Sequence, residues 1–417
     1  MVKMNKTWLL FLFLVAGSIR VFCQPGQDLV YMADKAFDSG DKAKAKSLYL
    51  QAAGMNNADA HYNLAYKYIL TKKESIFHFS EAAKQGHADA LKYLFDDLVF
   101  RANSLKEANP ELAMEVYQAA KKSNPLLTFY GEKEEVAAIR KSIEAGPFNG
   151  DEFTAKYGLV FNDREPGYAI WELAEEASRG GRFGNPDPRL VLQLVSRGGC
   201  VPAELEAAVD AAWQNWKSGK VVEFNLCDYV TSGFGQAYCA GREEEKENKI
   251  NRERIQALTL KLKNGAGELL PDAFKAASRF IEEKAWNEEG HDGTGYVAWA
   301  RESMMLQKSA WLGLVEKINS GVNPDTVVNR GDPDKALNEV YRMLINQLTK
   351  EPISGMNYSV TAAGVRSVQR LWILHRDASA SLFNRMAPLV SESAWKDWLT
   401  RIRTNELKKI PELRDHP

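Results

Sequence analysis

The chain has 417 residues, of which 45% are hydrophobic and 26% charged, and its formal net charge is −1 at pH 7. This length is enough for about two to four globular domains, and the composition excludes a largely disordered chain. The balanced charge excludes a protein that holds nucleic acid or anionic membrane by bulk electrostatics, because either function needs a basic excess or stripe.

The N-terminus has the pattern of a secretory signal peptide, which we assign to residues 1–23. Lys3 and Lys6 precede an apolar run at residues 8–17, and these correspond to the charged and hydrophobic regions of such a signal. Ten apolar residues are too few to span a bilayer. The cleavage points that stay open are those after Gly17, Ser18 and Cys23.

A lipoprotein signal is the alternative interpretation of this region, with Cys23 as the lipidated residue. Phe22 and Arg20 stand where that signal needs small and aliphatic residues, so we expect neither a lipid anchor nor a stable membrane span. Export matters for the cysteines, because an extracytoplasmic compartment permits disulfides.

Residues 25–130 contain a repeated phrase. The sequence QAAGMNNADA at residues 51–60 recurs as EAAKQGHADA at residues 81–90, a period of thirty residues. Periods in this range indicate stacked helix pairs. The second phrase resembles the Sel-like branch of tetratricopeptide-type repeats, in which an Ala-Ala pair lets two helices approach and a Gly closes the turn. Such an array is either a concave surface for a protein partner or a short helical spacer.

Residues 131–224 keep a helical pattern, clearest at residues 171–177 and 203–216. The Gly- and Pro-rich stretch between them, RGGRFGNPDP at residues 179–188, marks a loop. Asp187 or Pro188 is expected to open the helix that follows.

Two arginines in a Gly-rich loop allow a phosphate-binding interpretation of residues 179–188. No Walker Lys-Ser/Thr follows the loop and no strand precedes it, so this interpretation is weak. The Arg-Gly-Gly phrase recurs at residues 197–199. Two helix-ending turns, each with a left-handed Gly cap, are the simpler explanation.

The C-terminal part of the chain has two amphipathic stretches, residues 334–348 and 365–380, which we expect to pack as an antiparallel helical hairpin. Their combined pattern is Leu-Asn-x-x-Tyr followed by Gln-Arg-x-Trp-x-x-x-Arg-Asp. It resembles the LprI-like lysozyme-inhibitor domain, a small helical module of bacterial envelope proteins. The pattern is carried by Leu337, Asn338, Tyr341, Gln369, Arg370, Trp372, Arg376 and Asp377.

The unit with this pattern spans residues 329–411. Leu, Tyr and Trp at helical spacing are usually core residues, so we interpret the eight pattern residues as structural rather than as contacts to a partner. Arg376, four residues after Trp372, is expected to stack on the indole, which contributes about 0.5–1 kcal/mol. The closing helix is predicted to bury Trp395, Trp398, Leu399 and Ile402.

Residues 225–321 resemble a divergent first copy of the same unit. Ile250 and Asn251 take the place of Leu-Asn, but Arg254 replaces the Tyr. The acidic run at residues 243–247 allows a docking strip for a basic enzyme. Basic residues alternate with it, so a solvated helix face is the favoured interpretation.

Cys227 and Cys239 have eleven residues between them, which matches the spacing of the N-terminal cysteine pair in the LprI-like family. The resemblance therefore implies a disulfide, worth about 3 kcal/mol in the chain-entropy model. Cys200 would then be a free and buried thiol. A zinc site is not expected, because the chain has no second cysteine pair and no His at ligand spacing.

No catalytic motif is recognisable, neither Gly-x-Ser-x-Gly nor His-Glu-x-x-His nor a Cys-His arrangement. We predict no enzymatic activity, catalytic residue, cofactor, metal or nucleic-acid partner. The expected fold is all-α, with Sel-like repeats, a helical middle segment and two three-helix LprI-like units. By resemblance, the chain is a periplasmic or secreted bacterial binding protein that inhibits a lysozyme or another lytic enzyme. The alternative is a helical scaffold of the envelope without inhibitory activity.

Overall fold

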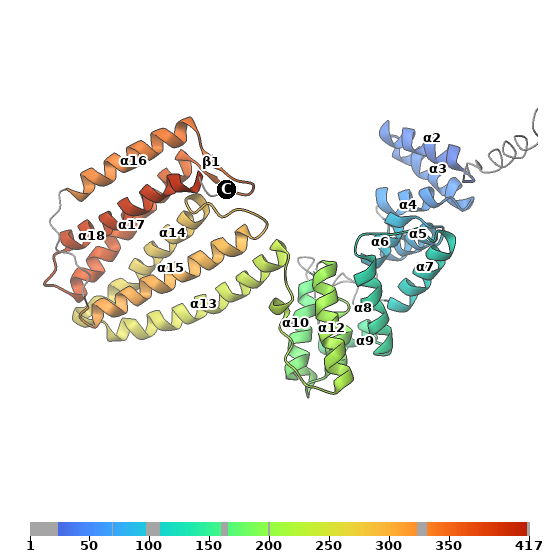
Figure 1. The fold of residues 1–417 in the computed structure, drawn as a ribbon, viewed down its shortest axis with the longest axis horizontal. Coiled ribbons are helices and arrows are strands. Elements are labelled where there is room, and N and C mark those ends of the chain that lie inside the picture. Colours follow the sequence, from blue (N-terminus) through green and yellow to red (C-terminus); the bar gives the residue numbers. More distant parts are fainter. Residues whose placement is uncertain are drawn as a thin grey trace, which may run out of the picture. The chain divides into compact units, whose positions relative to one another are not determined.

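The computed structural model describes residues 24–68, 70–96, 109–159, 166–198, 201–322 and 332–414. The expected signal peptide and Cys200 lie outside these ranges. The described part is helical except for one sheet of two short strands, which confirms the predicted all-α class (Figure 1). The chain divides into two compact units, with the boundary between Tyr229 and Val230.

The first unit consists of helices that mostly begin at a capping side chain. Asp41, Asn57 and Asn149 each accept a hydrogen bond from a backbone N–H of the first turn, and Thr71 forms a capping box with Glu74. Such caps satisfy backbone donors that the helix leaves unpaired. The helices are α2 (Gln27–Asp38), α3 (Lys42–Gly54), α4 (Ala58–Lys67), α5 (Lys72–Lys84), α6 (Ala88–Phe95), α7 (Pro110–Ser123), α8 (Glu132–Glu144), α9 (Gly150–Tyr157), α10 (Pro166–Arg179), α11 (Pro188–Val195) and α12 (Pro202–Ser218), with the short η3 (Gly181–Phe183) and η4 (Leu226–Asp228).

The two copies of the repeated phrase fold alike. Each ends one helix and starts the next through a residue with positive φ, Asn56 at 60° in the first copy and Gly86 at 90° in the second. The following residue, Asn57 or His87, caps the next helix. Ala52, Ala82 and Ala83 of the two Ala-Ala pairs are fully buried. The Sel-like family assignment stays a prediction.

The middle segment agrees with the expected start of α11 and with the expected turn that ends α10. Asp187 caps α11 and Pro188 is its first residue, as predicted. In the first Arg-Gly-Gly turn, Gly180 and Gly181 have positive φ of 92° and 46°, as predicted. In the second turn, Gly199 lies outside the described residues and Gly198 does not have a positive φ. It is a position of close approach, because a Cβ there would collide with the indole of Trp171 and lie 2.6 Å from the carbonyl oxygen of Gly167.

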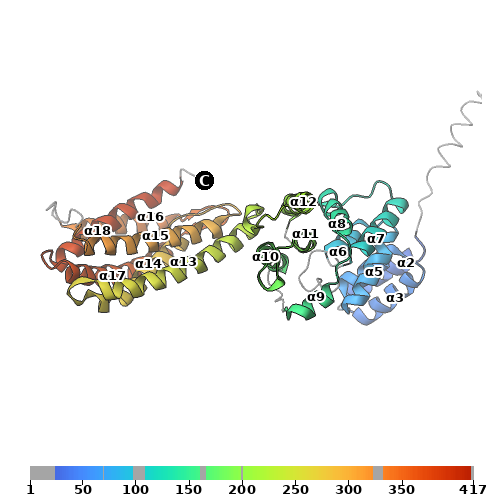
Figure 2. The same cartoon turned by 90° about the horizontal axis from the view of Figure 1, so that it is seen from below.

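The second unit is a bundle of long helices that lie alongside one another (Figures 1 and 2). One hydrophobic core runs from Leu258 to Ile410 and contains residues of both predicted LprI-like units. Whether the two halves are copies of one family domain stays a prediction. The elements are α13 (Gly233–Lys261), η5 (Lys263–Leu269), α14 (Leu270–Asn287), α15 (Tyr296–Asn319), α16 (Pro333–Lys350), β1 (Ile353–Ser354), β2 (Ser359–Val360), α17 (Ala362–Met386), α18 (Glu392–Lys409) and η6 (Ile410–Arg414).

The helix pairing differs from the expected hairpin. α17 packs most extensively on α14, while α16 packs chiefly on α18 and less on α17. α17 buries a long stripe that includes Val365, Val368 and Trp372. Ala273 and Ala277 lie on the buried face of α14, and small side chains let two helices approach closely. Amphipathicity predicts which faces are buried but does not name the partner helix.

The closing helix α18 also differs from its prediction in one position. Trp395 and Leu399 are buried as expected and Trp398 is partly buried against the core, whereas Ile402 is 40% exposed. Its neighbour Arg403 is buried instead, together with Leu407. The buried stripe therefore steps in intervals of four through residue 403, and a charged residue occupies a position that an apolar residue was expected to fill.

Cys227 and Cys239 are disulfide-bonded, so the expected bridge is present. A disulfide is consistent with export from a reducing cytoplasm. Among the helices in the described part of the chain, none combines the length and the apolar character that crossing a bilayer requires.

Replacing both Cys227 and Cys239 with Ser should lower the free energy of unfolding by about 3 kcal/mol, because the unfolded chain regains the entropy of the closed loop. Urea denaturation of the full-length protein, followed by circular dichroism, measures this change. A reducing agent should lower the midpoint of the wild type and leave that of the double variant unchanged. Equal midpoints for all four samples would contradict the prediction.

Candidate functional site

The residues of the LprI-like pattern are mostly packing residues. Leu337 and Trp372 are buried, and Tyr341 packs against the core. The guanidinium of Arg376 lies 5.1 Å from the ring centre of Trp372, and its Nε donates to Asp377 at 2.9 Å. The pattern residues that lie exposed at the surface are Asn338 and Arg370.

Gln369 leads from this pattern to a buried charged network. Its Oε1 accepts a hydrogen bond of 3.1 Å from Nε of Arg403, which is 0% exposed. The two terminal nitrogens of Arg403 donate to both carboxylate oxygens of Glu288, at 2.7 and 2.6 Å. Glu288 directly follows α14, so this bidentate ion pair joins the two predicted LprI-like units.

Further charges extend the network toward the surface. Arg403 also donates to Glu406 at 3.2 Å, and Glu406 accepts from Nζ of Lys284 at 2.9 Å. Burial alone would lower the pKa of Arg403, but Glu288 and Glu406 raise it above its usual value. Burial raises the pKa of Glu288 above its usual value in spite of the charge of Arg403, and both carboxylate oxygens of Glu288 accept hydrogen bonds from the guanidinium. We call Lys284, Glu288, Glu289, Arg403 and Glu406 the charged network.

Glu289 is held by hydrogen bonds from three side chains of the protein. It accepts hydrogen bonds from His291 at 3.1 Å, Ser303 at 2.5 Å and Gln307 at 2.7 Å. Burial would raise the pKa of Glu289, but these bonds and the charge of Lys284 lower it to about 2. Glu289 is therefore ionised at neutral pH.

A cavity of about 170 Å³ opens beside the charged network. Two carboxylates in one cavity are the groups that a glycosidase uses, one as acid and one as base or nucleophile. Here both oxygens of Glu288 accept hydrogen bonds from Arg403, and Glu289 is ionised at neutral pH and has no proton to donate. The cavity is lined by Lys284, Glu288, Glu289, Glu406, Lys409, Ile410 and Leu413.

His375 extends the polar seam of α17 into the core. Its ring stacks on Phe280 with centroids 5.1 Å apart, and its Nδ1 lies 3.2 Å from Oγ of Ser379. Trp311 donates its indole N–H to the same hydroxyl at 3.2 Å. Burial lowers the pKa of His375 to about 4, so the imidazole is neutral at pH 7.

A loop and a hairpin meet at the surface near this network. Residues 288–295 join α14 to α15, and the carboxylate of Asp292 accepts the backbone N–H groups of Gly293, Met356 and Asn357 at 2.8, 3.0 and 2.9 Å. The side chain of Asn357 donates to the carbonyl oxygen of Gly293 at 2.7 Å. These bonds fix the turn between β1 and β2 against the loop.

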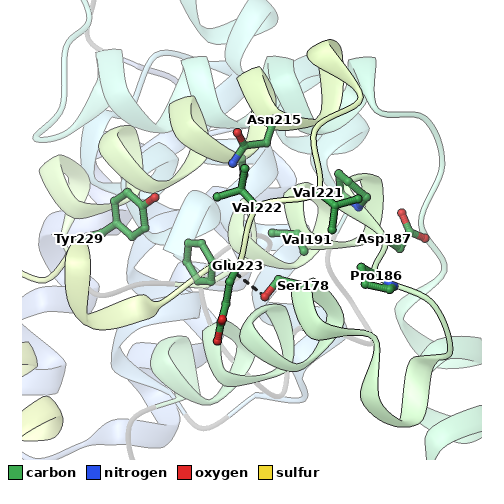
Figure 3. Close-up of a pocket in the computed structure, with 12 residues that line it drawn as sticks. Ser178, Pro186, Asp187, Val191, Asn215, Val221, Val222, Glu223 and Tyr229 are labelled. Carbon is green, nitrogen blue, oxygen red and sulfur yellow. Dashed lines mark hydrogen bonds between the residues drawn. The ribbon is translucent and has the colours of Figure 1, made fainter.

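The first unit offers a gap and a groove. The gap, about 10 Å³, lies beside Ser178 and Tyr229 (Figure 3). A single water needs about 10–15 Å³, so nothing larger fits. Oγ of Ser178 accepts the N–H of Phe224 at 2.9 Å and donates to the carbonyl of Glu175 at 2.7 Å, so this hydroxyl is already used. The groove, about 540 Å³, is lined by Tyr117, Phe129, Gly131, Glu132, Lys133, Glu134, Val136, Ala137 and Arg140.

The arginines of the Gly-rich loop are paired with acids. Arg179 forms an ion pair with Glu223 at 2.7 Å, and Arg182 contacts both carboxylate oxygens of Glu176. Cations that are already neutralised offer little to a phosphate. Within the residues that the structure describes, no group of three or more His, Cys, Asp or Glu is arranged to hold a metal ion.

Comparisons with family models, with curated proteins and with solved structures gave no match. The likeness to LprI-like and Sel-like families therefore rests on the motif residues alone.

The charged network was not predicted from the sequence. The available signal was the spacing of Trp395, Leu399, Arg403 and Leu407, a charged residue in an otherwise apolar row of intervals of four. A charge at such a position requires a buried partner. The sequence could not name Glu288, which lies 115 positions away.

Replacing Arg403 with Met should destabilise the protein by about 3–5 kcal/mol, because Glu288 is left as an uncompensated buried charge. Urea denaturation measures the loss. Adding Glu288→Leu should restore much of it, since removing both charges removes the need for pairing. The control is Arg370→Met at an exposed position, which should change stability by no more than about 0.5 kcal/mol. A single variant as stable as the wild type would contradict the prediction.

His375 should make the protein less stable in mild acid. The pKa is about 6.5 in an unfolded chain and about 4 in the folded protein, so between these values the unfolded chain binds more protons. The free energy of unfolding should therefore fall by roughly 3 kcal/mol between pH 7 and pH 4 because of this group.

The matched variant for this pH effect is His375→Phe, which keeps a ring stacked on Phe280. Urea denaturation at pH 7, 5.5 and 4 should show a smaller loss of stability for the variant than for the wild type. Parallel pH profiles for the two proteins would show that His375 does not contribute.

Proposed function

We propose that the protein is an exported, non-enzymatic binding protein of the bacterial envelope that inhibits a lysozyme or another peptidoglycan muramidase. Inhibition is what the resemblance to the LprI-like family implies, and the observation that supports the non-enzymatic part of the proposal is the pairing within the charged network. Glu288 and Arg403 satisfy each other, and Glu289 is saturated by donors. Carboxylates whose oxygens are occupied by internal hydrogen bonds stabilise the fold and are poorly placed to react with a substrate.

Two further features agree with this proposal. The disulfide between Cys227 and Cys239 is consistent with an oxidising compartment such as the periplasm. The pattern residues Leu337, Trp372 and Arg376 lie in or against the core, as expected if the LprI-like pattern specifies a fold that presents other residues to a partner.

Inhibition by such a protein would be steric. A muramidase must admit a glycan strand to a cleft that contains its two carboxyl groups, and a protein that covers the cleft prevents entry. A specific interface of this kind buries about 800 Å² on each partner. A rigid, disulfide-linked helical protein loses little conformational entropy on binding, which favours affinity.

Titrating a lysozyme and a lytic transglycosylase with the full-length mature protein tests the proposal. We expect the rate of peptidoglycan lysis by at least one of them to fall linearly and reach its minimum near one equivalent of inhibitor. The control is the same titration with heat-unfolded protein. Unchanged rates of both enzymes at micromolar inhibitor would contradict the proposal.

The alternative, a scaffold without inhibitory activity, is favoured by the groove of the first unit. Tyr117, Phe129 and Arg140 line it, and Tyr, Phe and Arg are enriched in protein interfaces. A partner captured from envelope extract by the wild type and lost in Arg140→Glu would support the scaffold, provided that neither lytic enzyme is inhibited.

A further inference from the structure

We infer that His61 and His78 form a pH-sensitive contact, which holds α4 against α5 at neutral pH and releases it in mild acid. His61 lies on α4 and His78 on α5, and their Nδ1 atoms are 2.9 Å apart. We call these two residues the histidine pair. The inference concerns the first unit alone and does not depend on the proposed inhibition of an enzyme.

The histidine pair is part of the packed interface between α4 and α5. His61 is only 6% exposed, and the centres of the two imidazole rings lie 5.1 Å apart. Phe77 packs its ring against both imidazoles, at 6.1 Å from His61 and 5.1 Å from His78. A charged imidazole needs water or a counter-charge. His61 has almost no access to water here, so charging it requires the interface to open.

The bond between the imidazoles tolerates one added proton but not two. In the neutral pair, the Nδ1–H of one ring donates to the lone pair of the other Nδ1. A first added proton can leave this bond in place, because a charged imidazole still donates to a neutral one. A second proton makes both nitrogens donors, and two like charges then face each other at hydrogen-bond distance. The doubly protonated pair must therefore separate.

The groups that could stabilise a charge on the histidine pair are few and already have partners. Glu81 favours the charged form of both imidazoles, but it is in an ion pair within α5. Glu74 favours charged His78, but it belongs to the capping box that starts α5. The backbone of Ala53, near the end of α3, favours charged His61. Burial outweighs these contacts, so the pKa of both imidazoles is lowered, that of His78 also by the charge of its partner.

The packing of α5 on α4 should therefore depend on pH. The pKa of an imidazole exposed to water is about 6.5, and both members of the histidine pair have lower values in the packed form. Below pH 6.5 the opened form binds more protons, and above it the packed form is favoured. Opening would uncover residues that α5 buries, among them Phe79, Ala82 and Ala83. Mild acid should thus expose part of the core of the first unit.

Hydrogen exchange of the full-length protein at pH 7 and pH 5, read by mass spectrometry with labelling times scaled to the intrinsic exchange rate, tests the inference. Peptides from residues 58–84 should open about 25-fold more often at pH 5, which is the factor that one imidazole of ordinary pKa contributes over this range. The double variant His61→Asn/His78→Asn should lose most of this effect, because two amides can still pair with each other but do not titrate.

The matched control is His87→Asn, which removes the remaining histidine of the first unit. His87 caps α6, and Asn57 caps α4 at the equivalent position of the first repeated phrase, so Asn suits this place. The control should keep the pH effect at residues 58–84. Equal opening of the wild type at both pH values would overturn the inference, and so would a pH effect of the same size in the double variant.

A second measurement decides the matter if the double variant does not fold. Nitrogen NMR of the full-length wild type with ring-labelled histidine should show a coupling between two imidazole nitrogens at pH 7, transmitted across the hydrogen bond, and its loss at pH 5. The absence of this coupling at pH 7, or its persistence at pH 5, would show that the histidine pair is not a pH-sensitive contact.

Discussion

The bidentate ion pair between Glu288 and Arg403 is the constraint on which the second unit depends. Neither group could remain buried alone, because desolvating one charge costs several kcal/mol. Their pairing brings the end of α14 to the middle of α18, so residues 115 positions apart share one hydrogen-bond geometry. The bundle must close in a way that keeps these two groups in contact.

The same contact organises the polar residues around it. Gln369, part of the LprI-like pattern, accepts the remaining Nε hydrogen of Arg403. Toward the surface, Glu406 accepts hydrogen bonds from both Arg403 and Lys284. A hydrophobic pair of similar volume would often be at least as stable as a buried ion pair. What the ion pair adds is geometry, since its donors and acceptors come from α14, α17 and α18 and are satisfied together when these helices lie as they do here.

The same geometry also fixes the loop that follows Glu288. The loop after Glu288 carries both Glu289, which is bound by three donors, and Asp292, which holds the β1–β2 turn. Residues 288–292 therefore contribute first to the core ion pair, then to the hydrogen bonds of Glu289, and then to the anchoring of the turn. The core of the same unit therefore holds the loop and the β1–β2 turn in place.

The sequence by itself determined the helical class, the place of several helices and the start of α11 at Asp187 and Pro188, because apolar periodicity, Pro and Asp at helix starts and Gly at turns act locally. It also indicated the disulfide through resemblance, and it predicted the stacking of Arg376 on Trp372 four residues earlier. Only the tertiary structure decided that α17 packs on α14 rather than chiefly on α16, that Arg403 replaces Ile402 in the buried row, and that Asp292 binds the β1–β2 turn. Each of these depends on a partner far away in the chain, and a helix face or a charged side chain carries no local mark of which distant group will satisfy it.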